Sequence, residues 1–357
     1  MLEVPPFLDQ WQSLTNEAGE AGDFSRLLDT DLDLQLFLHQ PEGVPSLVLT
    51  TGSEIVCNQE DLVSAAQIAV DATNTGSGTV VTLRLVDRKY LDLFLQICED
   101  IAPRVCAEKS DDRAALQLLR RFRTWRLMLK ADRHGRMDSK RSLGLYGELR
   151  TLGHLLDFCD DPLAVAHAWT GPGRGEQDFQ LAGMAIEVKS IVQNEPQRIF
   201  VDGARQLDES QFQALVVAHH HVHRQKGAGD TLPEVVAELR GRFDGDPSAR
   251  ELVDEGILLY GYVDSDESQY SEMGYAIDQT SYYRVQPGFP RLTEENLPLG
   301  VGGLRYVVEA SACVPFEINE ETLRGWLQDP PSIDILDGSA RGAESAQIEF
   351  KATGWKP

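Results

Sequence analysis

The sequence predicts an α+β protein, and three observations support this class. Several short segments alternate polar and apolar residues, as half-buried strands do. Longer segments repeat apolar residues every three or four positions, as amphipathic helices do. The chain has 357 residues, 42% of them hydrophobic, so it can bury a core and is long enough for two or three domains. We expect an N-terminal α+β domain at 1–109, a central core with a basic helix at 110–225, and a C-terminal α+β region with a loose acidic tail at 226–357.

The N-terminal part begins with strand candidates. The segment DLDLQLFLH at 31–39 alternates polar and apolar residues, and SLVLTTG and TVVTLRLV have similar character. From residue 89 to 107 the spacing becomes helical, with one face formed by Leu91, Phe94, Leu95 and Cys98. We therefore expect a small β-rich unit followed by a helix.

Charge is distributed unevenly along the chain. A net charge of −24 argues against a general nucleic-acid binder, because phosphate contacts need Lys and Arg. Residues 113–141 reverse this balance with ten Lys or Arg and two Asp. Such a segment can present a basic face to a polyanion, or it can pair with the protein's own acidic surface. The sequence leaves both interpretations open for the candidate nucleic-acid contacts in this segment, Arg120, Arg121, Arg123 and Arg126.

The segment at 143–158 predicts a helix whose buried stripe is formed by Leu145, Leu149, Leu152 and Leu156. Glu148 lies beside this stripe, where a carboxylate is either a flanking residue or one aimed into a site. The apolar segment AVAHAWT at 164–170 predicts a short strand, and a Gly-rich stretch follows it.

The segment DFQLAGMAIEVKS at 178–190 predicts a β-hairpin with Ala182-Gly183 as its two-residue turn. In this register the apolar side chains share one face, and the other face carries Asp178, Glu187 and Lys189. Two carboxylates facing each other across a ladder repel, at a Cβ separation of about 5 Å, unless a divalent cation lies between them. Lys189 can offset the negative charge, orient a water or stabilise a phosphate oxygen.

These residues carry a family resemblance. Asp178, eight residues, then Glu-x-Lys resembles the active site of the PD-(D/E)xK nuclease superfamily, and the order GLYGEL, W-T-G-P, D-F, A-I-E-V-K-S and A-R-Q-L-D is similar to members found with bacterial restriction and phage-defence genes. The resemblance implies an α-β-β-β-α-β restriction-endonuclease-like core with a mixed sheet. Gln177 stands where the family's proline would be. By this resemblance the four motif positions are Glu148, Asp178, Glu187 and Lys189.

The short motif alone is weak, because an acidic residue two positions before Lys also occurs at Asp87, Asp138 and Glu349. Only Glu187 has a hairpin partner upstream, an acidic helix before it and a strand after it. We therefore favour a catalytic site there, and a degenerate structural hairpin is the alternative. Gln206 is a further candidate for substrate contact by the resemblance, with a capping or surface role as its alternative.

The rest of the chain offers weaker signals. The segment RIFVDGARQLDES at 198–210 predicts a strand and a short helical turn, and a strand is expected at 212–224. Helices are expected at 231–243 and 249–256, and strands at 257–263, 273–285 and 303–318. Histidines alternate near the end of one strand (His219, His221 and His223) and could bind a transition metal, although an exposed surface run is the commoner case. No Gly-x-Ser-x-Gly or similar nucleophile setting occurs in the sequence.

Taken together, the sequence and the resemblance predict a Mg²⁺-dependent DNA endonuclease, with Mn²⁺ as a substitute and with Asp178, Glu187 and Glu148 as metal ligands. The alternatives are an inactive DNA-binding or assembly subunit and a purely protein-binding component of a defence complex. An ATPase or methyltransferase partner, self-association, and RNA in place of DNA stay open. No apolar run is long enough for a membrane span, and five cysteines without a C-x-x-C pair predict a cytoplasmic protein.

Overall fold

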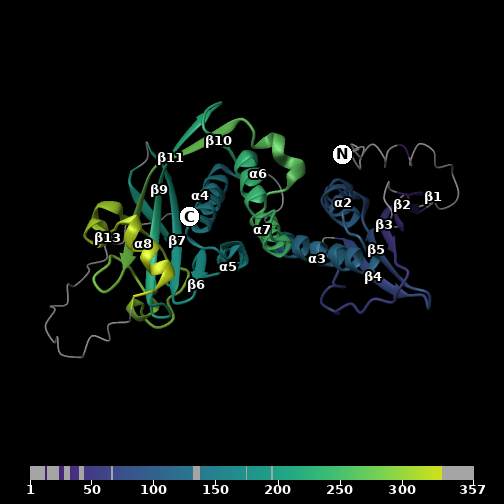
Figure 1. Ribbon diagram of the computed structural model, residues 1–357, viewed down its shortest axis with the longest axis horizontal. Helices are drawn as coiled ribbons and strands as arrows, with labels where there is room; N and C mark the ends of the chain where they lie inside the picture. Colours follow the sequence, from purple (N-terminus) through teal and green to yellow (C-terminus); the bar gives the residue numbers. More distant parts are fainter. Residues whose placement is uncertain are drawn as a thin grey trace.

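The computed structural model describes residue 13 and residues 24–27, 33–39, 44–65, 67–131, 137–173, 175–193 and 196–331. The described elements form two lobes, with α3 (Asp111–Lys130) and α7 (Pro247–Tyr260) at the junction between them (Figure 1). The expected loose tail lies outside these residues from position 332 on, and so do Arg133 and Arg136 of the basic segment.

The first lobe is an antiparallel sheet covered by two helices. Its strands follow the order β1-β2-β3-β5-β4, with bounds Phe24–Leu27, Asp33–His39, Val44–Thr50, Ile68–Asn74 (β4) and Thr79–Leu85 (β5). The helices α2 (Leu91–Cys106) and α3 (Asp111–Lys130) follow it. Alternate residues of β5 are buried in a core that also takes Phe94 from α2 and Trp125 from α3. The expected strands and the helix after them are present.

The second lobe is built on a mixed six-stranded sheet. Its order is β10-β11-β9-β7-β6, with β13 also paired to β11. The strands are β6 (Phe179–Leu181), β7 (Met184–Val192), β9 (Ala214–Lys226), β10 (Asp230–Thr231), β11 (Met273–Val285) and β13 (Glu317–Ile318). β7 runs parallel to β9, whereas the other pairs are antiparallel. A separate ribbon of β8 (Arg198–Asp202) and β12 (Arg305–Glu309) contributes Ile199, Val201 and Val308 to a core on one face of this sheet.

Helices cover the opposite face of the large sheet (Figure 1). α4 begins at the Asp138 cap, whose side chain accepts from the Arg141 N–H, and α6 begins at a capping box of Thr231 and Glu234. α7 begins after Asp246 and ends at Gly261, whose φ of 109° suits glycine. The helices are α4 (Ser139–Phe158), α5 (Pro162–Ala168), α6 (Leu232–Arg242), α7 (Pro247–Tyr260) and α8 (Glu320–Gln328).

Four expectations about secondary structure are wrong. The strand expected at 303–318 is divided, because two 3₁₀ helices at 310–312 and 314–316 separate β12 from β13. The segment 164–170, expected as a strand, largely forms α5, because Asp161 caps the Ala164 N–H and Pro162 suits the first helical position. Residues 257–260, also expected as a strand, are the last turn of α7. The helix that the resemblance implied between β8 and β9 is replaced by turns at 203–213. A short apolar run has no period that separates a strand from a buried helix.

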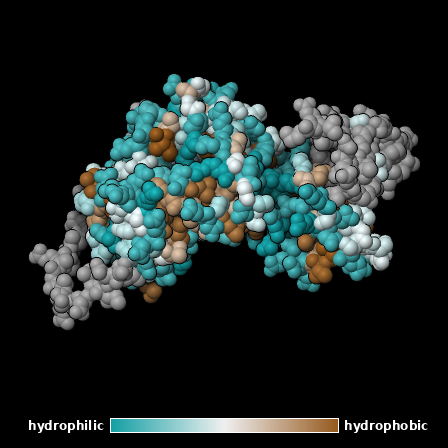
Figure 2. All heavy atoms as spheres, in the orientation of Figure 1, coloured by the Kyte–Doolittle hydropathy of each residue, from teal (hydrophilic) through white to brown (hydrophobic). Residues whose placement is uncertain are grey.

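The surface agrees with the composition. On the face drawn in Figure 2, hydrophilic residues dominate and hydrophobic ones gather toward the middle of the molecule. Among the residues that the structure describes, no helix is long and apolar enough to cross a membrane.

Candidate active site

The predicted hairpin is present, and its turn sets the register. Leu181 pairs with Met184 and Phe179 with Ile186, and Gly183 has a φ of 76°, which a residue without Cβ adopts at little cost. Asp178 lies one residue before β6 and outside the ladder. Instead of facing Glu187 as a strand partner, its Oδ2 accepts the Val188 N–H at 2.7 Å. The carboxylate is thereby held against the strand that carries the Glu-x-Lys motif.

The four motif residues come together at the edge of the mixed sheet. Glu148 is supplied by α4, and Glu187 and Lys189 by β7. Gly171 lies between the carboxyl groups of Glu148 and Asp178. A Cβ atom at position 171 would lie 2.8 Å from both Glu148 Oε2 and Asp178 Oδ1. A glycine at this position leaves room between the two carboxylates that any other side chain would fill.

Lys189 is held from two sides. Its Nζ lies 2.7 Å from Glu187 Oε1 and donates to Gln206 Oε1 at 3.0 Å. The same Gln206 oxygen accepts the Asp202 N–H at 3.0 Å, so the turn after β8 is tied to the site. Gln177 reinforces this tie, because its buried side-chain amide donates to the Arg205 carbonyl at 2.8 Å. The side-chain oxygen of Gln206, a predicted substrate contact, is thus engaged by Lys189.

The site concentrates buried carboxyl groups. Burial, then repulsion from Asp178, raises the pKa of Glu187 to about 8. The same two causes raise the pKa of Glu148 well above its ordinary value, and burial also raises the pKa of Asp178. Burial alone would lower the pKa of Lys189, but the carboxylates of Glu187 and Asp178 raise it, so this side chain is a cation at neutral pH. Such clusters of perturbed groups are typical of functional sites.

The carboxylate oxygens of the site are the type of ligand that a divalent cation such as Mg²⁺ prefers. Glu187 Oε2 is buried and, in the structure, has no hydrogen-bond partner, which is an unusual state for a carboxylate oxygen. The space beside Gly171 is bordered by two further carboxylate oxygens. Within the described ranges no group of three or more His, Cys, Asp or Glu side chains is arranged to hold a metal ion. Mg²⁺ commonly takes only one or two protein carboxylates together with water and substrate phosphate, so the residues present match its requirements.

A cavity of about 770 Å³ opens beside Gln206. Its walls are the turn at 202–206 and the loop at 297–305, which leads into β12. Arg205 and Arg305 also line it, and each is paired with acidic residues of its own chain, Arg205 with Glu176 and Glu294 and Arg305 with Asp202. The cavity therefore reaches the hydrogen-bonded shell of Lys189 and is large enough for part of a ligand.

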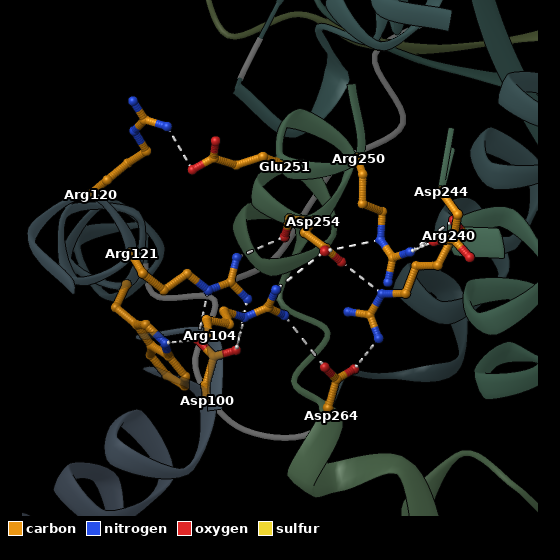
Figure 3. A network of polar contacts seen from close by, with 11 residues as sticks. Asp100, Arg104, Arg120, Arg121, Arg240, Asp244, Arg250, Glu251, Asp254 and Asp264 are labelled. Carbon is orange, nitrogen blue, oxygen red and sulfur yellow. Dashed lines mark hydrogen bonds and ion pairs between the residues drawn. The ribbon is translucent and has the colours of Figure 1, made fainter. Parts of the chain in front are cut away.

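Two of the candidate basic contacts of α3, Arg120 and Arg121, face α7, where they meet Glu251 and Asp254 (Figure 3). Arg121 is 5% exposed, forms a bidentate pair with Asp100 and donates to the Asp254 carbonyl. It is an internal residue here, and intramolecular pairing describes it rather than nucleic-acid contact. Arg120 pairs with Glu251 at 2.6 Å.

The other two candidate arginines also contact their own chain. Arg123 lies 3.6 Å from Glu60 and 3.7 Å from Asp61, and Arg126 donates to the Glu60 carbonyl at 2.6 Å. Arg120 and Arg123 remain about half exposed, so a nucleic-acid role for the exposed arginines stays a prediction.

The structure also gives the surroundings of the alternating histidines and of the other acid-x-Lys matches. His219 and His220 are buried, and burial lowers the pKa of His219 to about 4, whereas His223 pairs with Asp278 at 2.8 Å. Asp87 and Asp138, which begin two of the other acid-x-Lys matches, are helix caps. Two contacts of Glu148, Trp169 and Tyr260, were not assigned from the sequence. Trp169 belongs to the W-T-G-P segment that carries part of the family resemblance, and this segment is the sequence feature that could have indicated it.

Two acidic side chains and a lysine at a hairpin of a mixed sheet, with a third carboxylate from a preceding helix, match the arrangement of the PD-(D/E)xK motif. A family model described as "Putative PD-(D/E)XK family member" (DUF4420) matches residues 7–311. The chain belongs to this family. No curated protein and no solved structure gives a significant match.

Proposed function

We propose that the protein is a metal-dependent DNA endonuclease that hydrolyses phosphodiester bonds. The observation that carries the proposal is the grouping of Asp178, Glu187 and Lys189 in a buried site that leaves Glu187 Oε2 without a protein partner. Membership of a family described as PD-(D/E)XK supports the nuclease class. The resemblance to members encoded with restriction and phage-defence genes supports that biological setting.

Asp178 and Glu187 would hold Mg²⁺, with Glu148 as a third ligand directly or through water, and Mn²⁺ would substitute. The cation would supply positive charge that polarises a phosphate and acidifies an attacking water. Lys189 is cationic in the site and is fixed by Glu187 and Gln206. It would therefore donate to a phosphate oxygen or orient the water rather than remove a proton.

The substrate would approach through the cavity beside Gln206. A phosphate reaching Lys189 from there would compete with the Gln206 oxygen for the ammonium group. Because Arg205 and Arg305 already have acidic partners, a polyanion would have to displace these ion pairs, which are exposed and weak. This arrangement favours binding that depends strongly on salt concentration.

The test is a cleavage assay on supercoiled, linear and single-stranded DNA and on RNA, with Mg²⁺, Mn²⁺ or EDTA. The wild type should cut DNA only with a divalent cation, and Asp178→Asn should not cut it. DNA binding by the wild type without any cleavage, at any cation and with neighbouring gene products added, would instead identify the inactive binding or assembly subunit. Cleavage of RNA alone would change the substrate class.

A further inference from the structure

The Glu148 carboxyl accepts hydrogen bonds from two side chains that are not among the four motif residues. The indole N–H of Trp169 donates to Glu148 Oε2 at 2.8 Å, and the side chain of Tyr260 forms a second hydrogen bond to the same carboxyl. Trp169 follows α5, and Tyr260 is the last residue of α7. The carboxylate from α4 is therefore fixed by groups from two other elements.

Two glycines let these donors come close. A Cβ atom on Gly256 of α7 would lie 2.7 Å from ring carbon Cζ3 of Trp169, so the indole rests directly on the helix backbone. A Cβ atom on Gly144 of α4 would lie 2.6 Å from the Tyr260 hydroxyl. Arg141 of α4 also donates to the Tyr260 carbonyl at 2.6 Å, which fixes the end of α7 beside α4. Both donors thus lie directly against helix backbone at a glycine.

We propose that Trp169 and Tyr260 are positioning residues that aim the Glu148 carboxylate at the space beside Gly171 that the Asp178 carboxylate also borders. A glutamate side chain has three rotatable bonds, and it gains a single orientation only when its oxygens are tied. In the structure the oxygen that borders Gly171, Oε2, is the one that accepts from Trp169. This inference rests on the proposed function of the site.

The first variant is Trp169→Phe, which removes the indole N–H and keeps an aromatic ring on Gly256. Its matched control is Trp125→Phe: Trp125 is also buried, and its indole N–H donates to the Asp100 carboxylate at 2.6 Å, away from the motif residues. Losing a group that orients a ligand typically costs about 10–100-fold in activity or metal affinity. We expect Trp169→Phe to lower kcat by that factor with little change in KM for DNA, and Trp125→Phe to leave kcat near the wild-type value.

A double-mutant cycle with Glu148→Leu, which removes both acceptor oxygens, gives a readout that needs no activity. In metal-free protein the effects of Trp169→Phe and Glu148→Leu on thermal stability should not add, because the two side chains share one interaction. Tyr260→Phe, which removes only a hydroxyl, should be non-additive with Glu148→Leu in the same way and serves where Trp169→Phe does not fold. Additive effects for both variants, or equal kcat losses for Trp169→Phe and Trp125→Phe, would overturn the inference. A wild type that cleaves nothing would defeat the proposed function, while the metal-free cycle would still decide whether these residues position Glu148.

Discussion

At the scale of single residues, the burial of the Glu187 carboxyl lowers the stability of the folded protein. Its side chain is almost fully buried, its Oε1 pairs with the ammonium of Lys189, and its Oε2 has no hydrogen-bond partner in the structure. Asp178 and Glu148 add like charges around it. Burial beside other carboxyl groups raises the free-energy cost of ionising Glu187, so the cluster does not contribute to folding stability and is of the kind found at functional sites.

The raised pKa of Glu187 predicts how the free energy of unfolding changes with pH. In metal-free protein the folded state holds the Glu187 proton up to a pKa of about 8, whereas the unfolded state releases it near 4.5. The folded state therefore binds more protons between these values, and stability falls as pH rises through this window. Glu187→Gln should flatten this slope and raise the free energy of unfolding at pH 8, by on the order of a few kcal/mol. Urea unfolding in EDTA at several pH values measures it, and an unchanged slope would contradict the buried, raised pKa.

Gly171 offers a steric test of the metal site. Gly171→Ala would place a methyl group 2.8 Å from the oxygens of Asp178 and Glu148, whereas a Cβ atom on Gly173, two residues on, would meet nothing within 4 Å. We expect Mg²⁺ or Mn²⁺ to raise the melting temperature of the wild type and of Gly173→Ala, since a ligand that binds only the folded state stabilises it. Gly171→Ala should lose most of this response. Equal responses in the two variants would place any metal elsewhere.

At the scale of elements, α7 joins the two lobes through an ion network (Figure 3). Its Asp254 is buried and contacts Arg104 of α2 at 3.2 Å, Arg240 of α6 at 2.7 Å and Arg250 of α7 at 3.2 Å. Burial works against the charge of Asp254, but these arginines hold its pKa below the ordinary value. Much of the basic charge near α3 thus serves contacts inside the protein.

The network predicts a large stability effect for one carboxylate. Asp254→Asn would leave arginines from three helices partly unpaired, and removing one partner of a buried ion pair costs about 3–5 kcal/mol. Asp244→Asn is the matched control, because Asp244 also pairs with Arg250 but is exposed, and such surface changes usually stay within about 0.5 kcal/mol. Chemical denaturation of both variants gives the comparison, and similar losses would mean that Asp254 is not the centre of the network.

At the scale of the whole molecule, the sequence predicts the features that depend on residues close together in the chain. The hairpin follows from alternation and a turn at Ala182-Gly183, and α4 follows from its leucine stripe. The pairing of β8 with β12, the seat of Trp169 on α7 and the ion pairs of Arg121 join segments far apart in the chain. No short window encodes them, and α5 and the end of α7 read as strands for the same reason. The division into three domains stays a prediction.

The central claim is that Lys189 acts in catalysis, whereas Glu187 binds the metal. The most direct measurement is a Mg²⁺ titration by calorimetry beside a DNA cleavage assay, on Lys189→Ala and Glu187→Ala. Lys189→Ala should still bind metal, because Asp178 and Glu187 remain, and should lose about 10²–10⁴-fold in cleavage rate. Glu187→Ala should lose both metal affinity and cleavage. Cleavage by Lys189→Ala at the wild-type rate would contradict the nuclease assignment of this hairpin.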